Sequence, residues 1–201
     1  MVLLSIEDRL EYFIKQDWCQ RINPNEEFII TETESSGFAE IKCITKKTGF
    51  RLQKTNIHAK ENHRQPIPYL KNEKMADSTI FLWDNNKIEL HIIECKQTIK
   101  RSKWKGVKEQ FESSLLNGLA VTKILGFSDI QFHFYTAYRT DYLTDLKIHE
   151  AKFDAQKNTN FVLTQEWLEN KLRFEYLGMK NVAHYKIQLD ENGYYQNIYK
   201  F

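Results

Sequence analysis

The sequence predicts an α/β protein with a mixed central sheet flanked by helices, and with a C-terminal helix and β-hairpin extension. Three observations predict this fold. Segments rich in β-forming residues lie on both sides of one long segment whose apolar residues recur at helical spacing. A helix between two strands indicates a crossover connection, which is normally right-handed and makes those strands parallel. The 201 residues are 41% hydrophobic, which is enough for a substantial core.

The N-terminal part of the chain is expected to contain one helix and three short strands. Ser5 and Asp8 have the spacing of a capping box, and apolar residues then recur at helical spacing, which predicts a helix over residues 5–17. A polar segment with two prolines, residues 54–75, is expected to be a long loop. The β-rich segments between them are 28–33, 38–45 and 50–53, with turns at Ser36-Gly37 and Thr48-Gly49.

The central part is expected to form a hairpin, a helix and a further strand. The hairpin strands are residues 78–83 and 87–98, and the strand after the helix is residues 129–137. The helix, closed by Gly126, has an apolar stripe of Trp104, Val107, Phe111, Leu115, Leu119 and Ile124.

The C-terminal part is expected to be an extension, residues 139–201, packed on a core of residues 1–138. A helix is predicted near 164–174 with Thr164 as its N-cap. A terminal hairpin is predicted at about 184–201, turning on Asn192-Gly193.

The composition excludes several classes of protein. The three cysteines, Cys19, Cys43 and Cys95, are odd in number and lack a CxxC spacing, which argues against a disulfide framework and a zinc cage. A reducing, cytoplasmic location is therefore expected. No apolar run approaches eighteen residues, so no membrane insertion is expected. No phosphate-binding GxxxxGK[ST] motif occurs, so ATP-driven action would require a partner.

Two basic segments flank the central hairpin. Residues 42–75 hold nine Lys or Arg and two Glu, and residues 96–108 hold six Lys or Arg and no acid. A polyanion lying across the hairpin would account for this layout, although lysines also solvate exposed loops. The residues expected to contact nucleic acid are Arg51, Lys54, Lys60, Arg64, Lys100, Arg101, Lys103 and Lys105.

The hairpin register brings charged residues together. With a two-residue turn at Asn85-Asn86, opposed residues have numbers that sum to 171, so Asp77 faces Glu94. Lys96 lies two residues along the strand and shares their face. The rest of this face is apolar, and we expect a helix, the first one, to cover it.

Two adjacent carboxylates repel each other unless a cation lies between them. A hard divalent ion such as Mg²⁺, or Mn²⁺, suits oxygen ligands of this kind. Lys96 could hold a water molecule or stabilise a phosphate, and phosphodiester hydrolysis needs these groups. The alternative is an ordinary ion pair at a strand end, joining Lys96 to Glu94 or Asp77.

The order Asp77, then Glu94-Cys95-Lys96, then a helix and a strand resembles the PD-(D/E)xK nuclease superfamily, over residues 5–137. The resemblance implies a core of order α-β-β-β-α-β, a restriction-endonuclease-like fold. It implies metal binding by Asp77 and Glu94 and a catalytic role for Lys96. Ala76 stands where the family motif has proline.

The resemblance also implies further site residues. A third acidic metal ligand commonly comes from the first helix, where Glu11 ranks ahead of Glu7, and Glu40 on an early strand is a rival. Gln110 lies where RecB-like members carry a Gln-xxx-Tyr signature, and it joins the expected nucleic-acid contacts, although Ser114 occupies the Tyr position.

These expectations together predict an Mg²⁺-dependent endonuclease of the restriction or phage-defence type. Its expected partners are double-stranded DNA and a second copy of the chain, or the subunits of a defence complex. One alternative is a degenerate member of the same fold that binds nucleic acid or protein without cleaving. Another is an unrelated α/β interaction module that contacts a protein through loop 54–75 and the aromatic C-terminal hairpin.

Overall fold

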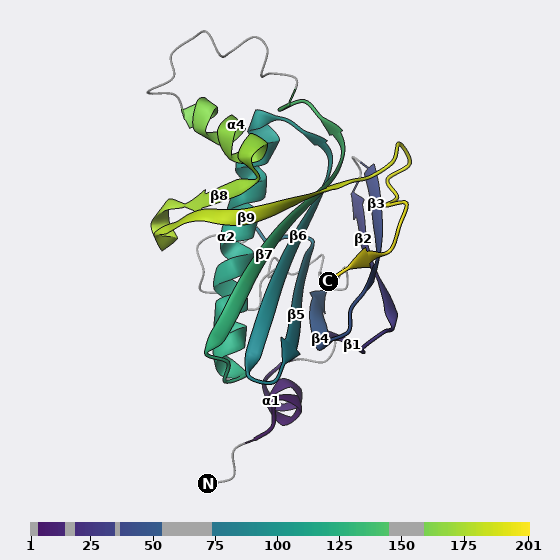
Figure 1. Cartoon of the computed structure of the whole chain (residues 1–201), viewed down its shortest axis with the longest axis vertical. Coiled ribbons are helices and arrows are strands. Elements are labelled where there is room, and N and C mark those ends of the chain that lie inside the picture. Colours follow the sequence, from purple (N-terminus) through teal and green to yellow (C-terminus); the bar gives the residue numbers. More distant parts are fainter. Residues whose placement is uncertain (1–3, 15–18, 35–36, 54–73, 145–158) are drawn as a thin grey trace.

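The computed structural model of the chain describes residues 4–14, 19–34, 37–53, 74–144 and 159–201. A seven-stranded mixed sheet forms the centre of the molecule. Helices α2 and α4 pack on one face of this sheet, and a three-stranded sheet packs on the other (Figure 1). The expected α/β class with a mixed central sheet is therefore confirmed.

The elements have the following bounds. The helices in the described residues are α1 (Ile6–Phe13), α2 (Arg101–Ile124), α4 (Thr159–Glu169) and the short 3-10 helix η3 (Glu175–Leu177). The large sheet contains, in spatial order, β1 (Cys19–Ile22), β4 (Thr48–Gln53), β5 (Ser78–Asp84), β6 (Lys87–Ile99), β7 (Asp129–Asp141), β9 (Met179–Gln188) and β8 (Lys171–Phe174). The small sheet contains β10 (Tyr199–Lys200), β3 (Gly37–Ile44) and β2 (Glu27–Glu34).

Strands β4, β5 and β6 form an antiparallel meander, and α2 carries the chain to β7, which is parallel to β6. The predicted hairpin register is confirmed, since Ser78 pairs with Ile93 and Asp84 with Lys87. Asn85 in the turn has φ 54°, a left-handed conformation that asparagine tolerates better than most residues.

Helix α2 covers one face of the sheet. Trp104, Phe111 and Leu115 are fully buried in the same core as Phe81 and Leu90. A Cβ on Gly118 would lie 2.4 Å from Leu90 Cδ2, so only glycine permits this close approach of helix and sheet. We expected the first helix to cover this apolar face. The face is instead covered mainly by α2, and α1 contributes Leu10 to the same core.

The prediction that Ile124 belongs to the buried apolar stripe of α2 is wrong. Ile124 is 46% exposed. It lies nine residues beyond Leu115, which on an α-helix places it half a turn out of phase with the buried side. The helix does end as predicted, with Gly126 at φ 91°.

The opposite face of the large sheet packs on the small sheet. Ile80, Ile93 and Cys95 pack there in one core with Ile30 and Ile41 of β2 and β3. Alternate residues of a strand point to opposite faces, so β5 and β6 contribute to both cores. Within the described residues, no helix combines the length and the apolar character that a membrane crossing requires.

Two predicted connections near the small sheet are wrong or lie outside the described residues. Thr48-Gly49 belongs to β4 and is not a turn, and β3 and β4 lie in different sheets. A Cβ on Gly49 would lie 2.3 Å from the Phe81 carbonyl oxygen, so this glycine serves close packing. Part of the predicted Ser36-Gly37 turn, and most of loop 54–75, lie outside the described residues.

The predicted C-terminal elements are partly wrong. Thr164 lies inside α4 and is not its N-cap, because the helix runs from Thr159 to Glu169. Asn170, at φ 55°, ends the helix, and residues 171–174 then form β8 with alternating burial. Segment 139–201 contributes β8 and β9 to the large sheet.

The predicted terminal hairpin is also wrong, although its turn exists. Gly193 has φ 95° and donates its backbone N–H to the Asp190 carbonyl at 3.1 Å. Beyond this turn the chain does not return along β9. It reaches the small sheet, where Tyr199 and Lys200 pair in parallel with Cys43 and Ile44.

Candidate functional site

The predicted pair of carboxylates lies at the end of the β5–β6 hairpin. Asp77 directly precedes β5, and its backbone N–H donates to Glu94 Oε2 at 3.1 Å. The backbone N–H of Cys95 donates to Asp77 Oδ2 at 2.8 Å. The two acidic residues are therefore cross-strand neighbours, as the register predicted.

Lys96 completes the predicted trio through an ion pair. Its Nζ donates to Glu94 Oε1. The Glu94 side chain is fully buried, whereas the Lys96 side chain is 17% exposed. A buried carboxylate needs a compensating charge or hydrogen bonds, and Lys96 supplies both. The contact agrees with a catalytic lysine and equally with the structural ion pair that the sequence left open.

The segment before Asp77 is fixed on helix α2. The Ala76 backbone N–H donates to Ser114 Oγ at 2.8 Å, and Gln110 Nε2 donates to the Met75 carbonyl at 3.3 Å. Gln110 and Ser114, singled out from the sequence, therefore both position the chain that leads into Asp77. The structure gives Gln110 a backbone partner, where the sequence suggested nucleic acid.

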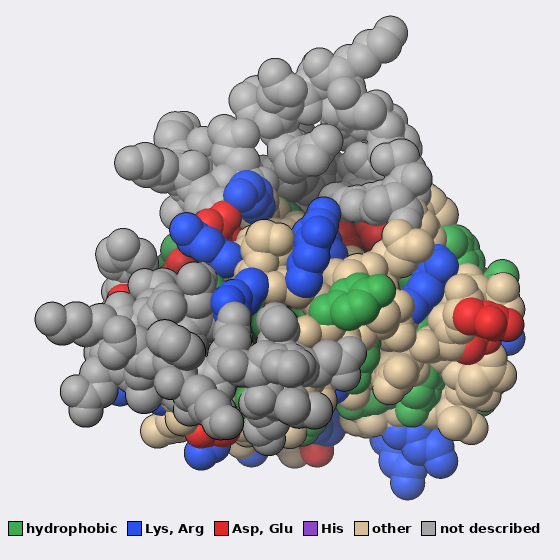
Figure 2. Space-filling model, turned by 90° about the horizontal axis from the view of Figure 1, so that it is seen from above, with side chains coloured by type: hydrophobic (Ala, Val, Ile, Leu, Met, Phe, Trp, Pro, Cys, Tyr) green, Lys and Arg blue, Asp and Glu red, His purple; other side chains and the backbone are tan. Residues whose placement is uncertain are grey.

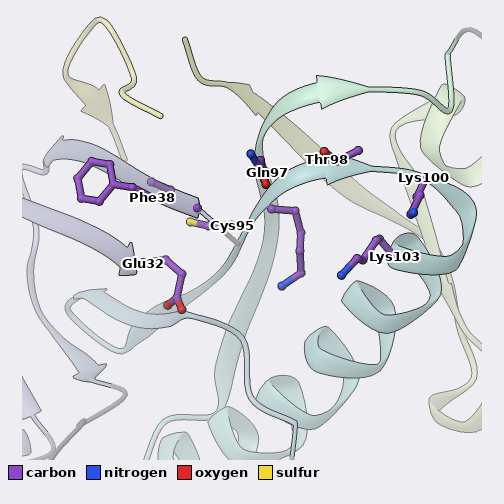
Figure 3. Close-up of a pocket in the computed structure, with 10 residues that line it drawn as sticks. Glu32, Phe38, Cys95, Gln97, Thr98, Lys100 and Lys103 are labelled. Carbon is purple, nitrogen blue, oxygen red and sulfur yellow. The ribbon is translucent and has the colours of Figure 1, made fainter. Parts of the chain in front are cut away.

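A cavity of about 210 Å³ opens beside Lys96, one residue of the trio (Figure 3). Strand β5 pairs with β6 only as far as Ile93, so residues 94–99 of β6 extend past it. Lysines from this part of β6 and from the start of α2 meet residues of the small sheet around the cavity. The lining residues are Glu32, Gly37, Phe38, Ala39, Cys95, Lys96, Gln97, Thr98, Lys100 and Lys103.

Glu32 is an acidic residue at this cavity that sequence reasoning missed. It lies on β2 and pairs with buried Ala39, on the face that carries Ile30. Burial, then the charges of Asp77, Glu94 and Glu32, raise the pKa of the Cys95 thiol, so Glu32 lies within electrostatic reach of Cys95, the residue next to Glu94. A charge two residues after Ile30, at an inward position of β2, was the available signal.

The other candidate third acids lie elsewhere. Glu11 is exposed on α1, which is held at the far end of α2 by a hydrogen bond from Arg9 Nη1 to the Leu125 carbonyl at 3.0 Å. Leu125 is eleven residues, or about 16 Å along a helix, from Ser114 beside the pair. Glu40 points away from the pair and lines another cavity with Tyr194. The structure does not bring either residue, or exposed Glu7, to Asp77 and Glu94.

The second basic segment surrounds the start of α2. Lys100, Lys103 and Lys105 are exposed. Arg101 donates from Nε to Thr164 Oγ1 at 3.3 Å, so it joins α2 to α4. Seen from this end of the molecule, Lys and Arg side chains gather close together on the surface (Figure 2).

The first basic segment is described only in part. Arg51 is half-buried on β4, donates from Nη1 to the Ile29 carbonyl at 2.5 Å, and has a pKa lowered by burial. It therefore links the two sheets. Lys54, Lys60 and Arg64 lie outside the described residues.

A second group of side chains that could bind a metal ion lies where the sequence predicted none. Asp77 and Glu94 supply two carboxylates, but on the opposite face of β6 the ligand atoms of Glu89, His91 and His133 lie within 4.8 Å of one another. Alternation along β6 places His91 on the face away from the trio, and the parallel pairing with β7 brings it beside His133.

Three kinds of comparison give no relative. No known family model, no curated protein and no solved structure matches the chain, so the arguments about its function rest on its own residues.

Proposed function

We propose that the chain is a metal-dependent endonuclease that hydrolyses phosphodiester bonds in nucleic acid, with double-stranded DNA as its substrate. The observation that carries this proposal is the convergence of Asp77, Glu94 and Lys96, together with the cavity that Lys96 lines with two further lysines. An anionic substrate would be attracted by the lysines, and a cation by the carboxylates.

The order of elements supports a restriction-endonuclease-like core. Helix α1, the meander β4–β5–β6, the crossover helix α2 and the parallel strand β7 follow the α-β-β-β-α-β order of the PD-(D/E)xK superfamily. In this chain β1, β2 and β3 are inserted between α1 and β4. The small sheet built on β2 and β3 forms one wall of the cavity.

The donor set fits Mg²⁺, because Asp77 and Glu94 offer oxygen ligands from two adjacent strands. When bound, the ion would supply charge stabilisation for a pentacovalent phosphate and lower the pKa of a bound water. Lys96 would then exchange its contact with Glu94 for one with the phosphate or the attacking water. Lys100 and Lys103 would hold the flanking phosphates, and Glu32 replaces Glu11 as our candidate for a third acid.

A cleavage assay on duplex DNA, single-stranded DNA and RNA tests this proposal directly. We expect cuts in duplex DNA with Mg²⁺ or Mn²⁺ and none after chelation, because the carboxylates alone cannot stabilise the phosphate charge. Ca²⁺ serves as a control that binds oxygen ligands with looser geometry. Absence of cleavage on every substrate, with nucleic-acid binding retained, would favour the degenerate binding module in which Lys96 and Glu94 form only an ion pair.

The lysines at the start of α2 give a second test. Replacing Lys100 and Lys103 by alanine should weaken duplex binding and reduce the slope of log K against log salt by about 1.8, since each phosphate contact contributes about 0.9. Lys123→Ala is the matched control, because that exposed lysine lies at the other end of α2. An unchanged slope in the double variant would show that these lysines only solvate the surface.

A further inference from the structure

Two histidines and a glutamate meet on the face of the large sheet opposite Asp77 and Glu94. His91 of β6 and His133 of β7 are direct neighbours in the parallel pairing of these strands. Glu89 lies two residues before His91 and therefore points to the same face. The imidazole rings stack with their centroids 4.7 Å apart, and the ligand atoms of all three side chains lie within 4.8 Å of one another.

One ring nitrogen of each histidine in this group has no hydrogen-bond partner among the described residues. Nε2 of His91 and Nε2 of His133 are both buried and unpaired among the described residues. His91 Nε2 lies 3.5 Å from Glu89 Oε2, but this contact lacks hydrogen-bond geometry. Buried polar atoms in native proteins are nearly always paired, so two ring nitrogens without a hydrogen bond in one such group indicate a missing partner.

We propose that Glu89, His91 and His133 bind a divalent transition-metal ion of the zinc class. Two imidazole nitrogens and one carboxylate oxygen are ligands that Zn²⁺ accepts, with a fourth position left for water or another group. Mg²⁺ prefers oxygen ligands, so this site would select a different ion from the Asp77–Glu94 pair. The inference does not depend on the proposed nuclease activity.

The surroundings favour the ligand forms of these side chains. Burial lowers the pKa of both His91 and His133, so both imidazoles are neutral at pH 7 and can donate a lone pair. The contact with His91 and the ion pair with Lys47 lower the pKa of Glu89 to about 2, so the carboxylate is ionised. Tyr135 OH lies 2.9 Å from His91 Nδ1 and can fix the ring orientation, as outer partners of metal-bound histidines do.

The ammonium group of Lys47 neutralises Glu89 in this structure, as a bound metal ion would. Its Nζ lies 2.5 Å from Glu89 Oε2, the oxygen nearest His91 Nε2. The Lys47 side chain is 32% exposed, so it can turn towards solvent when a metal ion neutralises Glu89. Lys47 therefore competes with the metal, and removing its charge should tighten metal binding.

The spacing suits one ion, and the surface offers an entry path. Ligands at about 2.0–2.1 Å from one ion are at most about 4.2 Å apart, so ligand atoms near the 4.8 Å limit would close slightly through side-chain rotation. Glu89 and Lys47 line a surface concavity of about 490 Å³ beside the β5–β6 turn, through which an ion can reach the site.

Binding of Co²⁺ and Zn²⁺ to the full chain, prepared without a polyhistidine tag and with saturating Mg²⁺ present, tests the proposal. We expect one Co²⁺ per chain, with the visible spectrum of nitrogen and oxygen ligation, displaced by Zn²⁺. Zn²⁺ at a hundredfold excess over its Kd should raise the melting temperature by about 5–10 °C. Lys47→Met should lower the Kd, by about tenfold.

The variants separate this site from other ligands. Glu89→Gln and His133→Asn should each weaken Co²⁺ binding by at least tenfold, whereas Glu94→Gln, which alters the other acidic site, should leave it unchanged. No cysteine belongs to this group, so thiolate bands are not expected. Unchanged Co²⁺ binding in folded Glu89→Gln and His133→Asn, or no binding by the wild type, would overturn the proposal.

Discussion

Replacing Glu94 by glutamine should reduce DNA cleavage by a thousandfold or more while the chain still folds. Glutamine can accept the Asp77 backbone N–H as Glu94 does, but it carries no charge for a metal ion. Loss of metal-centred charge stabilisation is worth several kcal/mol of barrier, and about 4 kcal/mol corresponds to a thousandfold. Turnover on duplex DNA in Mg²⁺, with circular dichroism as the folding check, measures this effect.

Lys96→Met should also abolish cleavage, but at a cost in stability. It removes the ion pair of Lys96 with the fully buried Glu94 carboxylate, which should lower the free energy of unfolding by about 3–5 kcal/mol. The double variant Glu94→Gln with Lys96→Met removes both charges, so it should regain stability and remain inactive.

Asp84→Asn and Lys87→Met are matched controls, since they make the same charge changes at the exposed turn of the same hairpin. Near wild-type turnover in either single site variant would remove that residue from the active site. If the double variant recovers both stability and cleavage, Lys96 and Glu94 form only a structural ion pair.

Acid should destabilise the fold strongly through His184. This residue is 2% exposed on β9, and its Nε2 lies 2.9 Å from Thr136 Oγ1. Burial, helped by the charge of Lys186, lowers the pKa of His184 from 6.5 to about 3. Between these pH values the unfolded chain binds a proton that the folded chain does not, so stability is full above pH 6.5 and falls as the pH falls. The total effect is on the order of 5 kcal/mol.

Urea unfolding between pH 8 and pH 4 measures this dependence. His184→Phe combined with Thr136→Val replaces both polar partners by apolar groups, which avoids an unpaired hydroxyl. The slope of the unfolding free energy against pH should decrease by up to about 1.4 kcal/mol per pH unit below pH 6.5. The unfolding free energy of the variant at pH 8 is the reference for its values at lower pH. If the free energy of the variant depends on pH as steeply as that of the wild type, the assignment to His184 is contradicted.

The central elements could be predicted because their patterns are local. The register of the β5–β6 hairpin follows from a two-residue turn and from alternation, and a slip by one residue would expose Phe81 and Leu90. The face that carries Asp77 and Glu94 followed directly from that register. Helix α2 was equally clear, because its apolar residues repeat over 24 residues.

The errors concern partners that lie far apart in the sequence. A Thr-Gly pair between two β-rich segments has the pattern of a hairpin turn, and the sequence does not show that Gly49 packs under Phe81. Likewise, Asn192-Gly193 does mark a turn, but the strand after it pairs with β3 and not with β9. Glu32 and His133 were missed as site residues for the same reason, since each meets its neighbours only through the arrangement of strands.

The parallel pairing of β10 with β3 also affects the order of folding. Tyr199 and Lys200 contact Cys43 and Ile44, so the small sheet is closed by residues more than 150 positions apart in the chain. Closing so long a loop is slow, because its entropy must be lost before the contacts form. During synthesis on the ribosome, the edge of β3 that pairs with β10 would therefore stay unpaired until Tyr199 and Lys200 emerge. The wall of the cavity that contains Glu32 would become rigid after the hairpin that carries Asp77 and Glu94.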